Sequence, residues 1–455
     1  MAEETIIAIS TPIGYGGLGI VRLSGDKSFS IAKKIFRPKK PKAKIQPRRP
    51  LLGNLYTFEQ KEFFEEAYLT YFPPPQTYTR EEMVEISCHG SPVVLEEVVR
   101  LGIKAGARHA HPGEFTLRAY LNGRIDILQA EAVNDLIQAS SLFQAKISFS
   151  QLRGSLSQKI DSLKKNIIHL LSQIEASIEF PEEGLRISGR QIAKTTEMTI
   201  RNIKNLIRSY NLGKTLREGL HLAITGRANV GKSTLFNSLL EKERAIVTPY
   251  PGTTRDFLQE KISIKDSLFT LTDMAGLSAP SHPVEKEGIK KGEKLLSQAD
   301  GVLLMFDSSQ RETPDDLRLI TKYKHKNLFL VFNKMDLPTR IDKEKITNQG
   351  KNFPGLDISA LKGTNLERLK QMIHETFVPT RDQGEEILLH LRQKLLLEET
   401  LASLSEGRRL LEEGYSEEIY AQEIRKAIST LGQLTGEIRV DEIMENIFDN
   451  FCVGK

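Results

Sequence analysis

The chain contains 455 residues, enough for about two to four domains of ordinary size. Apolar residues make up 39% and charged residues 27%, a balance that is typical of a soluble globular protein and excludes disorder as the main state. The 64 basic and 59 acidic residues leave a net charge of +5, which permits nucleic-acid binding but does not argue for it.

Cysteine content and the chain's N-terminus favour a reducing, cytoplasmic compartment. Two cysteines, Cys88 and Cys452, cannot form a disulfide framework, so we expect reducing surroundings. The acidic N-terminus lacks the apolar stretch of a secretory signal and is unlike an Arg-rich transit peptide. Because no run approaches 18 apolar residues, we expect a cytoplasmic protein that does not span a membrane.

Two predicted strands and a basic segment come first along the chain. The apolar runs Ile6–Ile9 and Ile20–Leu23 flank a glycine-rich turn, which favours strand, turn and strand. Residues 33–50 carry nine Lys and Arg, four prolines and no acid, and proline at this density predicts no regular element. This segment is either a solvated basic loop or a loop that contacts RNA phosphates, since clustered positive charge releases counterions on binding.

Helical patterns then surround a region of alternating elements. Leucine and isoleucine recur every three or four residues from Leu152 to Ile178, a helical stripe that Pro181 ends. Further helices are predicted over 191–210, 385–412, 416–431 and 443–451. Between about 218 and 378 apolar strands alternate with helices, which indicates a mostly parallel sheet. The strand candidates are His221–Thr225, Phe269–Thr272, Val302–Phe306 and Leu328–Phe332.

The expected architecture is multidomain α/β, with an α/β domain inserted into an all-α helical domain behind an N-terminal α+β domain. The expected boundaries are 1–120 for the N-terminal domain, 121–216 and 380–455 for the two parts of the helical domain, and 217–379 for the inserted domain.

A phosphate-binding motif opens the inserted domain. Residues 226–233, G-R-A-N-V-G-K-S, match G-x-x-x-x-G-K-[ST] between a predicted strand and a predicted helix. In this pattern backbone N–H groups wrap the phosphates, Lys232 reaches the β- and γ-phosphates, and the Ser233 hydroxyl ligates Mg²⁺. Residues 273–276, D-M-A-G, follow a strand as D-x-x-G does in GTPases. We expect Asp273 to hold Mg²⁺ through water and Gly276 to sense the γ-phosphate.

Three further stretches select guanine and form the switch. Asp336, in the N-K-M-D run 333–336, can accept both N1–H and the exocyclic amino hydrogens of guanine, a donor pair that adenine lacks. Ser359 and Ala360 fit the loop that touches guanine O6, and Thr254 is the candidate switch threonine that closes around Mg²⁺. In this order the motifs predict a Ras-like GTPase domain. The residues expected to contact GTP are Asn229, Val230, Gly231, Lys232, Ser233, Thr234, Thr248, Pro249, Tyr250, Pro251, Gly252, Thr253, Thr254, Asp273, Met274, Ala275, Gly276, Asn333, Lys334, Asp336, Ser359 and Ala360.

One expected group is missing. Ras-type enzymes carry a water-orienting glutamine just after D-x-x-G, where this chain has Leu277. An apolar side chain cannot orient water, so another group must stabilise the transition state. A K⁺ ion held by Asn229 and the carbonyl-rich loop 248–253 would take the place of an arginine finger. Carboxylates in the stretch 285–287 would then orient the water.

Four motifs outside the inserted domain carry a resemblance. They are T-P-I-G-Y-G-G-L-G-I-V-R (11–22), Y-T-R-E-E-M-V-E-I-S-C-H-G (78–90), G-E-F-T-L-R-A-Y-L-N-G-R-I-D (113–126) and F-C-V-G-K (451–455). With them the chain resembles the MnmE (TrmE) family of tRNA-modification GTPases over essentially its whole length. Arg80 stands where the family motif has glycine, and Pro249 and Pro251 stiffen the switch loop.

The resemblance implies a homodimer whose N-terminal domain dimerises and binds a tetrahydrofolate one-carbon derivative, 5-formyl- or 5,10-methylene-tetrahydrofolate. It implies K⁺-dependent GTP hydrolysis and a partner, MnmG (GidA), that carries FAD and joins a heterotetramer or larger assembly. Together they would add an aminomethyl or carboxymethylaminomethyl group to C5 of the tRNA wobble uridine.

The resemblance also implies residue roles. Folate contacts fall on Arg22, Glu85, Arg124 and Lys455, and the water-orienting carboxylate falls on Glu285. The K⁺ ligands fall on Asn229, Thr248, Tyr250 and Thr253, and those of Mg²⁺ on Ser233 and Thr254.

The sequence leaves open the role of Cys452 and the choice among alternative functions. Cys452 is either a catalytic thiol or a small buried hydrophobe. Cys88 and His89 are expected to be structural, because neighbours on a strand point to opposite faces. The alternative functions are a ribosome-assembly GTPase of the Era or EngA type and an RNA-binding protein with a decayed GTPase. Folate binding to residues 1–120 would argue against the ribosome-assembly GTPase, which needs no folate site. The intact Lys232 and Asp336 argue against a decayed GTPase.

Overall fold

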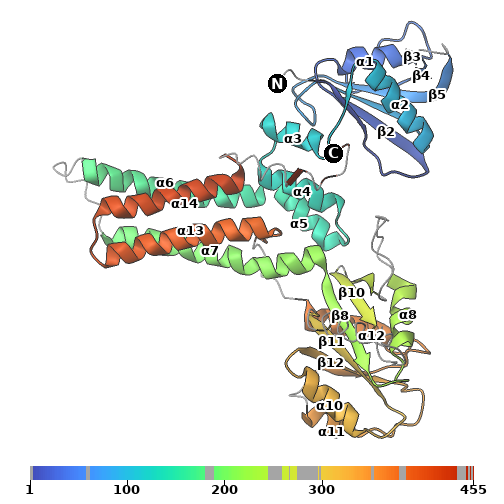
Figure 1. Ribbon diagram of the computed structural model, residues 1–455, viewed down its shortest axis with the longest axis vertical. Helices are drawn as coiled ribbons and strands as arrows, with labels where there is room; N and C mark the ends of the chain where they lie inside the picture. The colour runs from blue at the N-terminus through green and yellow to red at the C-terminus, as the bar shows by residue number, and fades with distance from the viewer. Residues whose placement is uncertain are drawn as a thin grey trace, which may run out of the picture. The chain divides into compact units, whose positions relative to one another are not determined.

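The computed structural model describes residues 4–57, 62–179, 189–243, 259–265, 267–273, 296, 299–349, 353–378, 386–437, 447–448, 451 and 454 (Figure 1). The chain divides into two compact units. The first combines residues 1–134, 151–164 and 428–455, and the second combines 135–150 and 165–427. None of the helices in the described ranges is long and apolar enough to cross a membrane.

The first unit is built on a seven-stranded sheet in the order β3-β4-β5-β6-β2-β1-β7. The predicted strand pair at its centre is confirmed, because β1 and β2 pair antiparallel. Helices α1 and α2 cover one face of the sheet through a shared apolar core (Figure 1). The elements are β1 (Ile6–Ile9), β2 (Gly16–Ser24), α1 (Ser28–Ile35), β3 (Phe36–Pro38), β4 (Leu51–Tyr56), β5 (Phe63–Phe72), β6 (Met83–Gly90), α2 (Pro92–Lys104), β7 (Arg108–His109) and α3 (Glu114–Leu121).

The prediction of no regular element from residue 33 to residue 50 was wrong at its beginning. Helix α1 extends to Ile35, and β3 pairs antiparallel with β4. Pro38 is tolerated because β3 lies at the edge of the sheet, where a missing N–H interrupts no ladder. Residues 39–50 contain no helix or strand, only an isolated bridge from Pro47 to Tyr71.

Within the described residues, the helical part contains six helices: α4 (Ile127–Ile137), α5 (Leu142–Leu152), α6 (Ser155–Glu179), α7 (Gly189–Glu218), α13 (Leu391–Glu412) and α14 (Glu417–Thr435). The predicted stripe from Leu152 to Ile178 is not one helix, because the chain turns at Gly154 with φ of +90°. Only residues 447 and 448 of the predicted helix 443–451 are described as helical, and most of that stretch lies outside the described residues.

The predicted helix at residues 385–412 begins later than expected. Residues 386–390 are not helical, and α13 starts at Leu391. This segment passes close to α7: the Leu388 N–H donates to Ser209 Oγ at 3.0 Å. A Cβ added to Gly213 of α7 would lie 1.8 Å from the Leu388 carbonyl oxygen, so only glycine permits the approach.

A hydrogen-bonded triad stands beside this contact. Arg217 of α7 donates to His390 Nδ1 at 2.9 Å, and His390 Nε2 donates to Asp135 at 2.7 Å. The chain therefore leaves α7 for the inserted domain and returns to α13 at neighbouring points.

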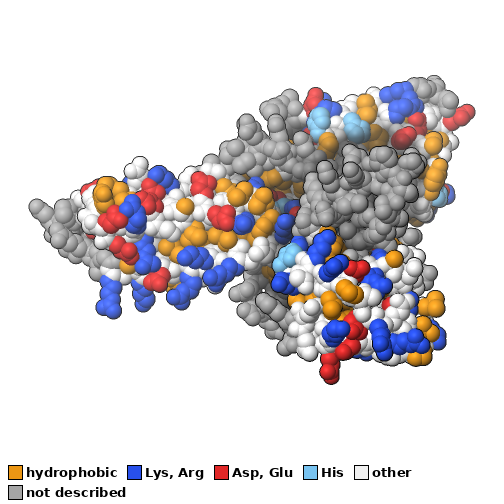
Figure 2. Space-filling view, turned by 60° about the horizontal axis from the view of Figure 1, so that its bottom comes forward, with side chains coloured by type: hydrophobic (Ala, Val, Ile, Leu, Met, Phe, Trp, Pro, Cys, Tyr) orange, Lys and Arg blue, Asp and Glu red, His pale blue; other side chains and the backbone are white. Residues whose placement is uncertain are grey.

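Figure 2 shows Lys and Arg side chains (blue) along the helical part. The exposed basic residues of α7 include Arg190, Lys194, Arg201, Lys204 and Arg208, which recur at helical spacing.

The inserted domain contains a six-stranded sheet in the order β13-β12-β11-β8-β10-β9. Only β9 runs antiparallel to its neighbour, so the predicted mostly parallel sheet and its four strands are confirmed. Helices α8 and α12 pack on one face, and α10 and α11 on the other. The elements are β8 (Leu220–Gly226), α8 (Lys232–Glu243), β9 (Gln259–Ile264), β10 (Ser267–Asp273), β11 (Gly301–Asp307), α10 (Pro314–Tyr323), β12 (Asn327–Asn333), α11 (Lys343–Gln349), β13 (Gly355–Asp357) and α12 (Leu366–Phe377).

Candidate functional site

The phosphate-binding turn joins β8 to α8 at the carboxyl edge of the parallel strands. Three of its residues have left-handed backbone: Gly226 (φ +150°), Asn229 (φ +64°) and Gly231 (φ +99°). A Cβ on Gly226 would lie 2.5 Å from the Met305 carbonyl oxygen, and one on Gly231 would lie 2.3 Å from Asn333 Nδ2. The two glycines are therefore required by both conformation and space, whereas asparagine is among the side chains that tolerate this region.

Lys232 lies inside this turn. Its ammonium group donates to the carbonyl oxygens of Gly226 at 3.0 Å and Arg227 at 2.7 Å, and the residue is 6% exposed. Burial lowers the pKa of Lys232, although the charge of Asp273 opposes that change. A phosphate bound in the turn would supply the negative charge that this buried ammonium group favours.

Two oxygen donors expected at Mg²⁺ are brought together. Ser233 Oγ donates to Asp273 Oδ2 at 2.8 Å, because the parallel pairing of β8 and β10 places the starts of both loops at one edge. A hydroxyl and a carboxylate are hard oxygen ligands of the kind that Mg²⁺ prefers, so the residues present fit this ion. Thr254, the third expected participant, lies outside the described residues.

Asn333 ties three motifs to one another. Its buried side-chain amide donates from Nδ2 to the Val230 carbonyl at 2.8 Å, and its Oδ1 accepts from the Ala360 N–H at 2.9 Å. The phosphate turn, the end of β12 and the loop at Ser359 thus share one hydrogen-bonded frame. The sequence motifs predict these segments, and the structure shows how a single buried amide holds them together.

Lys334 has a partner that the sequence analysis missed. Its ammonium group, on a left-handed residue (φ +67°), lies 2.6 Å from Asp307 Oδ2 at the end of β11. Burial alone would raise the pKa of Asp307, but hydrogen bonds from Lys334 and Ser309 outweigh it and hold the pKa below its usual value. The available signal was an aspartate directly after a buried strand, next to the strand that ends in Asn333.

The carboxylate of Asp336 is a charged hydrogen-bond acceptor that Ser359 stabilises. A hydrogen bond from Ser359 lowers the pKa of Asp336, so its carboxylate is ionised at neutral pH. Ser359 is itself buried. A carboxylate fixed in this way can accept the two adjacent N–H groups on the edge of guanine.

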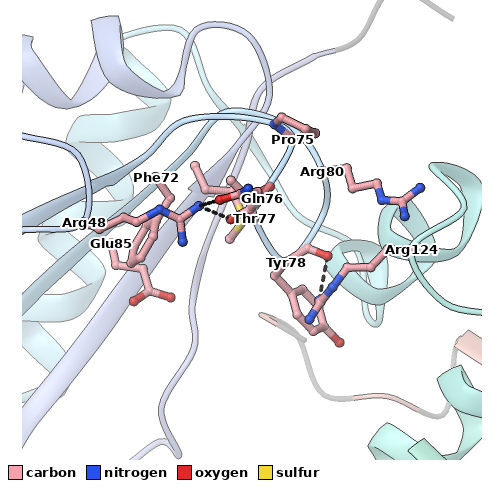
Figure 3. A pocket seen from close by; sticks show the side chains of 10 residues that line it. Arg48, Phe72, Pro75, Gln76, Thr77, Tyr78, Arg80, Glu85 and Arg124 are labelled. Atoms are coloured by element: carbon pink, nitrogen blue, oxygen red, sulfur yellow. Dashed lines mark hydrogen bonds between the residues drawn. The ribbon is translucent and has the colours of Figure 1, made fainter. Parts of the chain in front are cut away.

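The first unit contains a cavity of about 500 Å³ that is lined by two of the four expected folate residues (Figure 3). Glu85 and Arg124 line it, and Arg22 pairs with Glu85 across strands β2 and β6. Both Nε and Nη2 of Arg22 donate to Glu85 Oε1, at 2.9 and 2.8 Å. Glu85 Oε2 receives no hydrogen bond from any described residue and so remains a free acceptor. The full lining is Arg48, Phe72, Pro75, Gln76, Thr77, Tyr78, Arg80, Met83, Glu85 and Arg124.

Tyr78 is one of several lining residues that the sequence did not assign to the site. The Arg124 guanidinium lies 4.6 Å from the centre of its ring and donates to the Tyr78 carbonyl at 2.8 Å (Figure 3). Burial raises the pKa of the Tyr78 phenol, so it stays neutral, and it bonds to Thr116 at 2.9 Å. An aromatic ring, a free carboxylate oxygen and a cation suit a flat heterocycle with an anionic tail.

Cys88 and His89 lie on opposite faces of β6, as predicted. The Cys88 side chain is buried, and this burial, followed by the charge of Glu65, raises the pKa of its thiol to about 11. His89 is exposed and pairs with Glu65 at 2.8 Å. The two residues therefore form no thiol–imidazole pair.

Several expected site residues lie outside the described residues. They are Thr248, Pro249, Tyr250, Pro251, Gly252, Thr253, Thr254, Met274, Ala275, Gly276, Glu285, Cys452 and Lys455. Of the expected K⁺ ligands, only Asn229 is described.

Comparison with known proteins covers the whole chain. Residues 5–124 match the family model described as GTP-binding protein TrmE N-terminus, and residues 127–452 match that of the MnmE helical domain. The tRNA modification GTPase MnmE of Aquifex aeolicus is 40% identical over 457 residues, and that of Thermoanaerobacter sp. is 38% identical over 462 residues. In each case the similarity covers 100% of both chains.

Proposed function

Because the chain belongs to the MnmE family of tRNA-modification GTPases, we propose that it couples K⁺-dependent GTP hydrolysis to modification of the tRNA wobble uridine at C5. The N-terminal cavity is the observation that carries this proposal. A ribosome-assembly GTPase of the Era or EngA type needs no one-carbon donor and therefore no such cavity.

In the nucleotide site, Lys232 neutralises phosphate charge, and Asn333 keeps the phosphate turn and the guanine loop in register. Asp336 selects guanine. Ser233 and Asp273, with Thr254, would hold Mg²⁺, which supplies charge neutralisation at the β- and γ-phosphates. Asn229, Thr248, Tyr250 and Thr253 would hold K⁺, and Glu285 would orient the attacking water.

In the N-terminal cavity, Glu85 Oε2 accepts ring N–H groups of a tetrahydrofolate one-carbon derivative, either 5-formyl or 5,10-methylene. The Arg22 guanidinium pairs with Glu85 and holds its carboxylate in place. Arg124, together with Lys455, attracts the glutamate tail. Cys452 is the candidate nucleophile for the one-carbon step.

The proposed assembly is a homodimer of this chain joined by a flavin-containing MnmG (GidA) subunit and tRNA in the cytoplasm. We assign the folate-binding domain to residues 1–120, the two helical parts to 121–216 and 380–455, and the GTPase domain to 217–379. Arg48, near the end of the basic segment 39–50, lines the cavity, which supports a role for this segment in placing tRNA near the one-carbon donor.

Mass spectrometry of tRNA nucleosides from a deletion strain tests the proposal. We expect C5-aminomethyl-type wobble uridines to disappear and to return with the wild-type gene but not with Asp336→Ala. Asp315→Ala, an equivalent change at an exposed residue of α10, should restore them. Unchanged wobble uridines in an organism that makes them would exclude this function, and ribosome profiles would then test the assembly alternative.

A further inference from the structure

The N-terminal cavity has an excess of positive charge. Three of its lining residues, Arg48, Arg80 and Arg124, pair with no carboxylate among the described residues. Their guanidinium groups donate instead to neutral acceptors: Arg48 to the Gln76 carbonyl at 2.6 Å, Arg80 to the Asn122 carbonyl at 2.8 Å, and Arg124 to the Tyr78 carbonyl at 2.8 Å. The one acidic lining residue, Glu85, already pairs with Arg22.

Arg80 and Arg124 lie close together on one side of the cavity (Figure 3). The loop before β6 supplies Arg80, and the chain just after α3 supplies Arg124. A Cβ added to Gly123, the neighbour of Arg124, would lie 3.4 Å from Arg80 Nη1. Two exposed guanidinium groups from separate loops therefore lie near one another, and neither forms an ion pair with a carboxylate among the described residues.

Arg80 also keeps a backbone conformation that costs energy. Its φ is +63°, in the left-handed region, which costs a non-glycine residue about 1 kcal/mol or more. The family motif has glycine at this position, where the conformation is free of that cost. A cation retained at a strained position on a cavity rim points to a ligand of opposite charge.

We propose that Arg80, together with Arg124, forms a subsite for the additional carboxylates of a poly-γ-glutamate tail on the bound folate. This inference rests on the proposed folate function and extends it. A monoglutamate brings only two tail carboxylates, whereas each added γ-linked glutamate brings one more beyond the cavity. Arginine suits this task because its planar fork can hold a carboxylate by two parallel hydrogen bonds.

Equilibrium dialysis of the full-length protein with 5-formyl-tetrahydrofolate monoglutamate and pentaglutamate tests the subsite. We expect the pentaglutamate to bind wild type about fivefold more tightly, the scale of one or two exposed charge pairs. This ratio should shrink at 300 mM KCl, because salt screens exposed charges.

Variants at three arginines assign the effect to a residue. Arg80→Gln should bring the ratio of the two affinities close to one, and Arg80→Lys should leave an intermediate ratio. Arg49→Gln, an equally exposed neighbour of the cavity outside its lining, should keep the wild-type ratio. If Arg48→Gln abolishes the preference and Arg80→Gln does not, the assignment to Arg80 is wrong.

The outcomes separate this inference from the proposal beneath it. If wild type binds the monoglutamate but shows no preference for the pentaglutamate, the tail subsite is excluded and the folate proposal stands. If neither compound binds, both fail. If Arg80→Gln weakens tRNA binding and leaves the glutamate ratio unchanged, the rim serves RNA phosphates and the inference is overturned.

Discussion

At the scale of single residues, guanine recognition depends on the charge of Asp336. Ser359 fixes the carboxylate and lowers its pKa, so it accepts hydrogen bonds at any pH near neutrality. Asp336→Asn would replace an acceptor with an amide that donates to the C2 carbonyl of xanthine instead. We expect GTP affinity to fall by roughly 100-fold, about 3 kcal/mol, and xanthosine triphosphate to bind better than GTP.

Nucleotide titrations with both triphosphates measure this switch. The exposed Asp315→Ala variant controls for loss of a surface charge. An Asp336→Asn protein that still prefers GTP would show that another group reads the base.

The thiol of Cys88 is predicted to be unreactive. With a pKa of about 11, roughly one thiol in a thousand is ionised at pH 8, and the side chain is also buried. We expect iodoacetamide to modify Cys88 in native protein at least 100-fold more slowly than after unfolding, with a rate that rises with pH up to about 11. Peptide mass spectrometry follows the modification, and rapid labelling of native Cys88 at pH 8 would contradict its assignment as a packing residue.

Residue-level motifs could be predicted from sequence where their chemistry is local. The turn 226–233 needs glycine, lysine and serine within eight positions, and that spacing is visible in the chain. The bond between Lys334 and Asp307 was not predictable in the same way. It depends on the register in which Asp307 pairs with Asn333 across β11 and β12, and register is a property of the folded sheet.

At the scale of elements, the segment before α13 shows where periodicity fails. Ile387, Leu388 and Leu389 are three consecutive apolar residues, a pattern that fits a helix and a buried extended segment equally well. All three are almost completely buried. The extended conformation is favoured because Gly213 has no side chain, which lets the segment lie against α7.

The substitution Gly213→Ala, which adds one methyl group, tests the contact between α7 and this segment. Alanine favours helices over glycine by about 1 kcal/mol, so Gly213→Ala would stabilise an isolated helix. Here the added Cβ meets the Leu388 carbonyl at 1.8 Å, and we expect a net destabilisation of about 2 kcal/mol or more. Thermal unfolding measures the change, with the exposed neighbour Lys214→Ala expected within about 0.5 kcal/mol of wild type.

The basic segment 39–50 is the second element whose role can be decided. Lys40, Lys42 and Lys44 are exposed and have no side-chain partner among the described residues. If they contact tRNA phosphates, replacing all three with glutamine should weaken tRNA binding and reduce the slope of log affinity against log salt by about 2 to 3.

A triple variant on α7, with glutamine at Arg201, Lys204 and Arg208, carries the same change in charge and is the matched control. We expect it to bind tRNA nearly as well as wild type. Equal losses in both triple variants would show only a general effect of net charge, and the segment would then be a solvated loop.

At the scale of the whole molecule, the first unit depends on the far end of the chain. Ser10 donates to the Gly454 carbonyl at 3.2 Å, and Tyr120 donates to the Gly436 carbonyl at 2.6 Å. Phe448 and Phe451 are buried, and a Cβ on Gly113 would lie 2.7 Å from the Phe448 carbonyl oxygen. A fragment of residues 1–120 would lose all of these contacts, which the sequence alone did not reveal.

We therefore expect deletion of residues 438–455 to destabilise the first unit. The deletion removes two buried phenylalanines, Phe448 and Phe451, whose burial contributes about 3–6 kcal/mol of stability. Hydrogen exchange should become faster in β1 and α3, while β8 and β11 of the second unit serve as the internal control. Unchanged protection of β1 and α3 would contradict the role given to the C-terminal residues.

The neighbouring exit and return points of the inserted domain have a consequence for its evolution. The segment from β8 to α12 is in effect one long loop between α7 and α13. The contacts at Leu388 and His390 hold the two ends of this loop together. The entropy cost of closing a loop grows only with the logarithm of its length, so a domain-sized loop costs about 2–3 kcal/mol more than a short linker. A nucleotide-binding module can thus be gained, exchanged or excised at this point while the host helices keep the same partners.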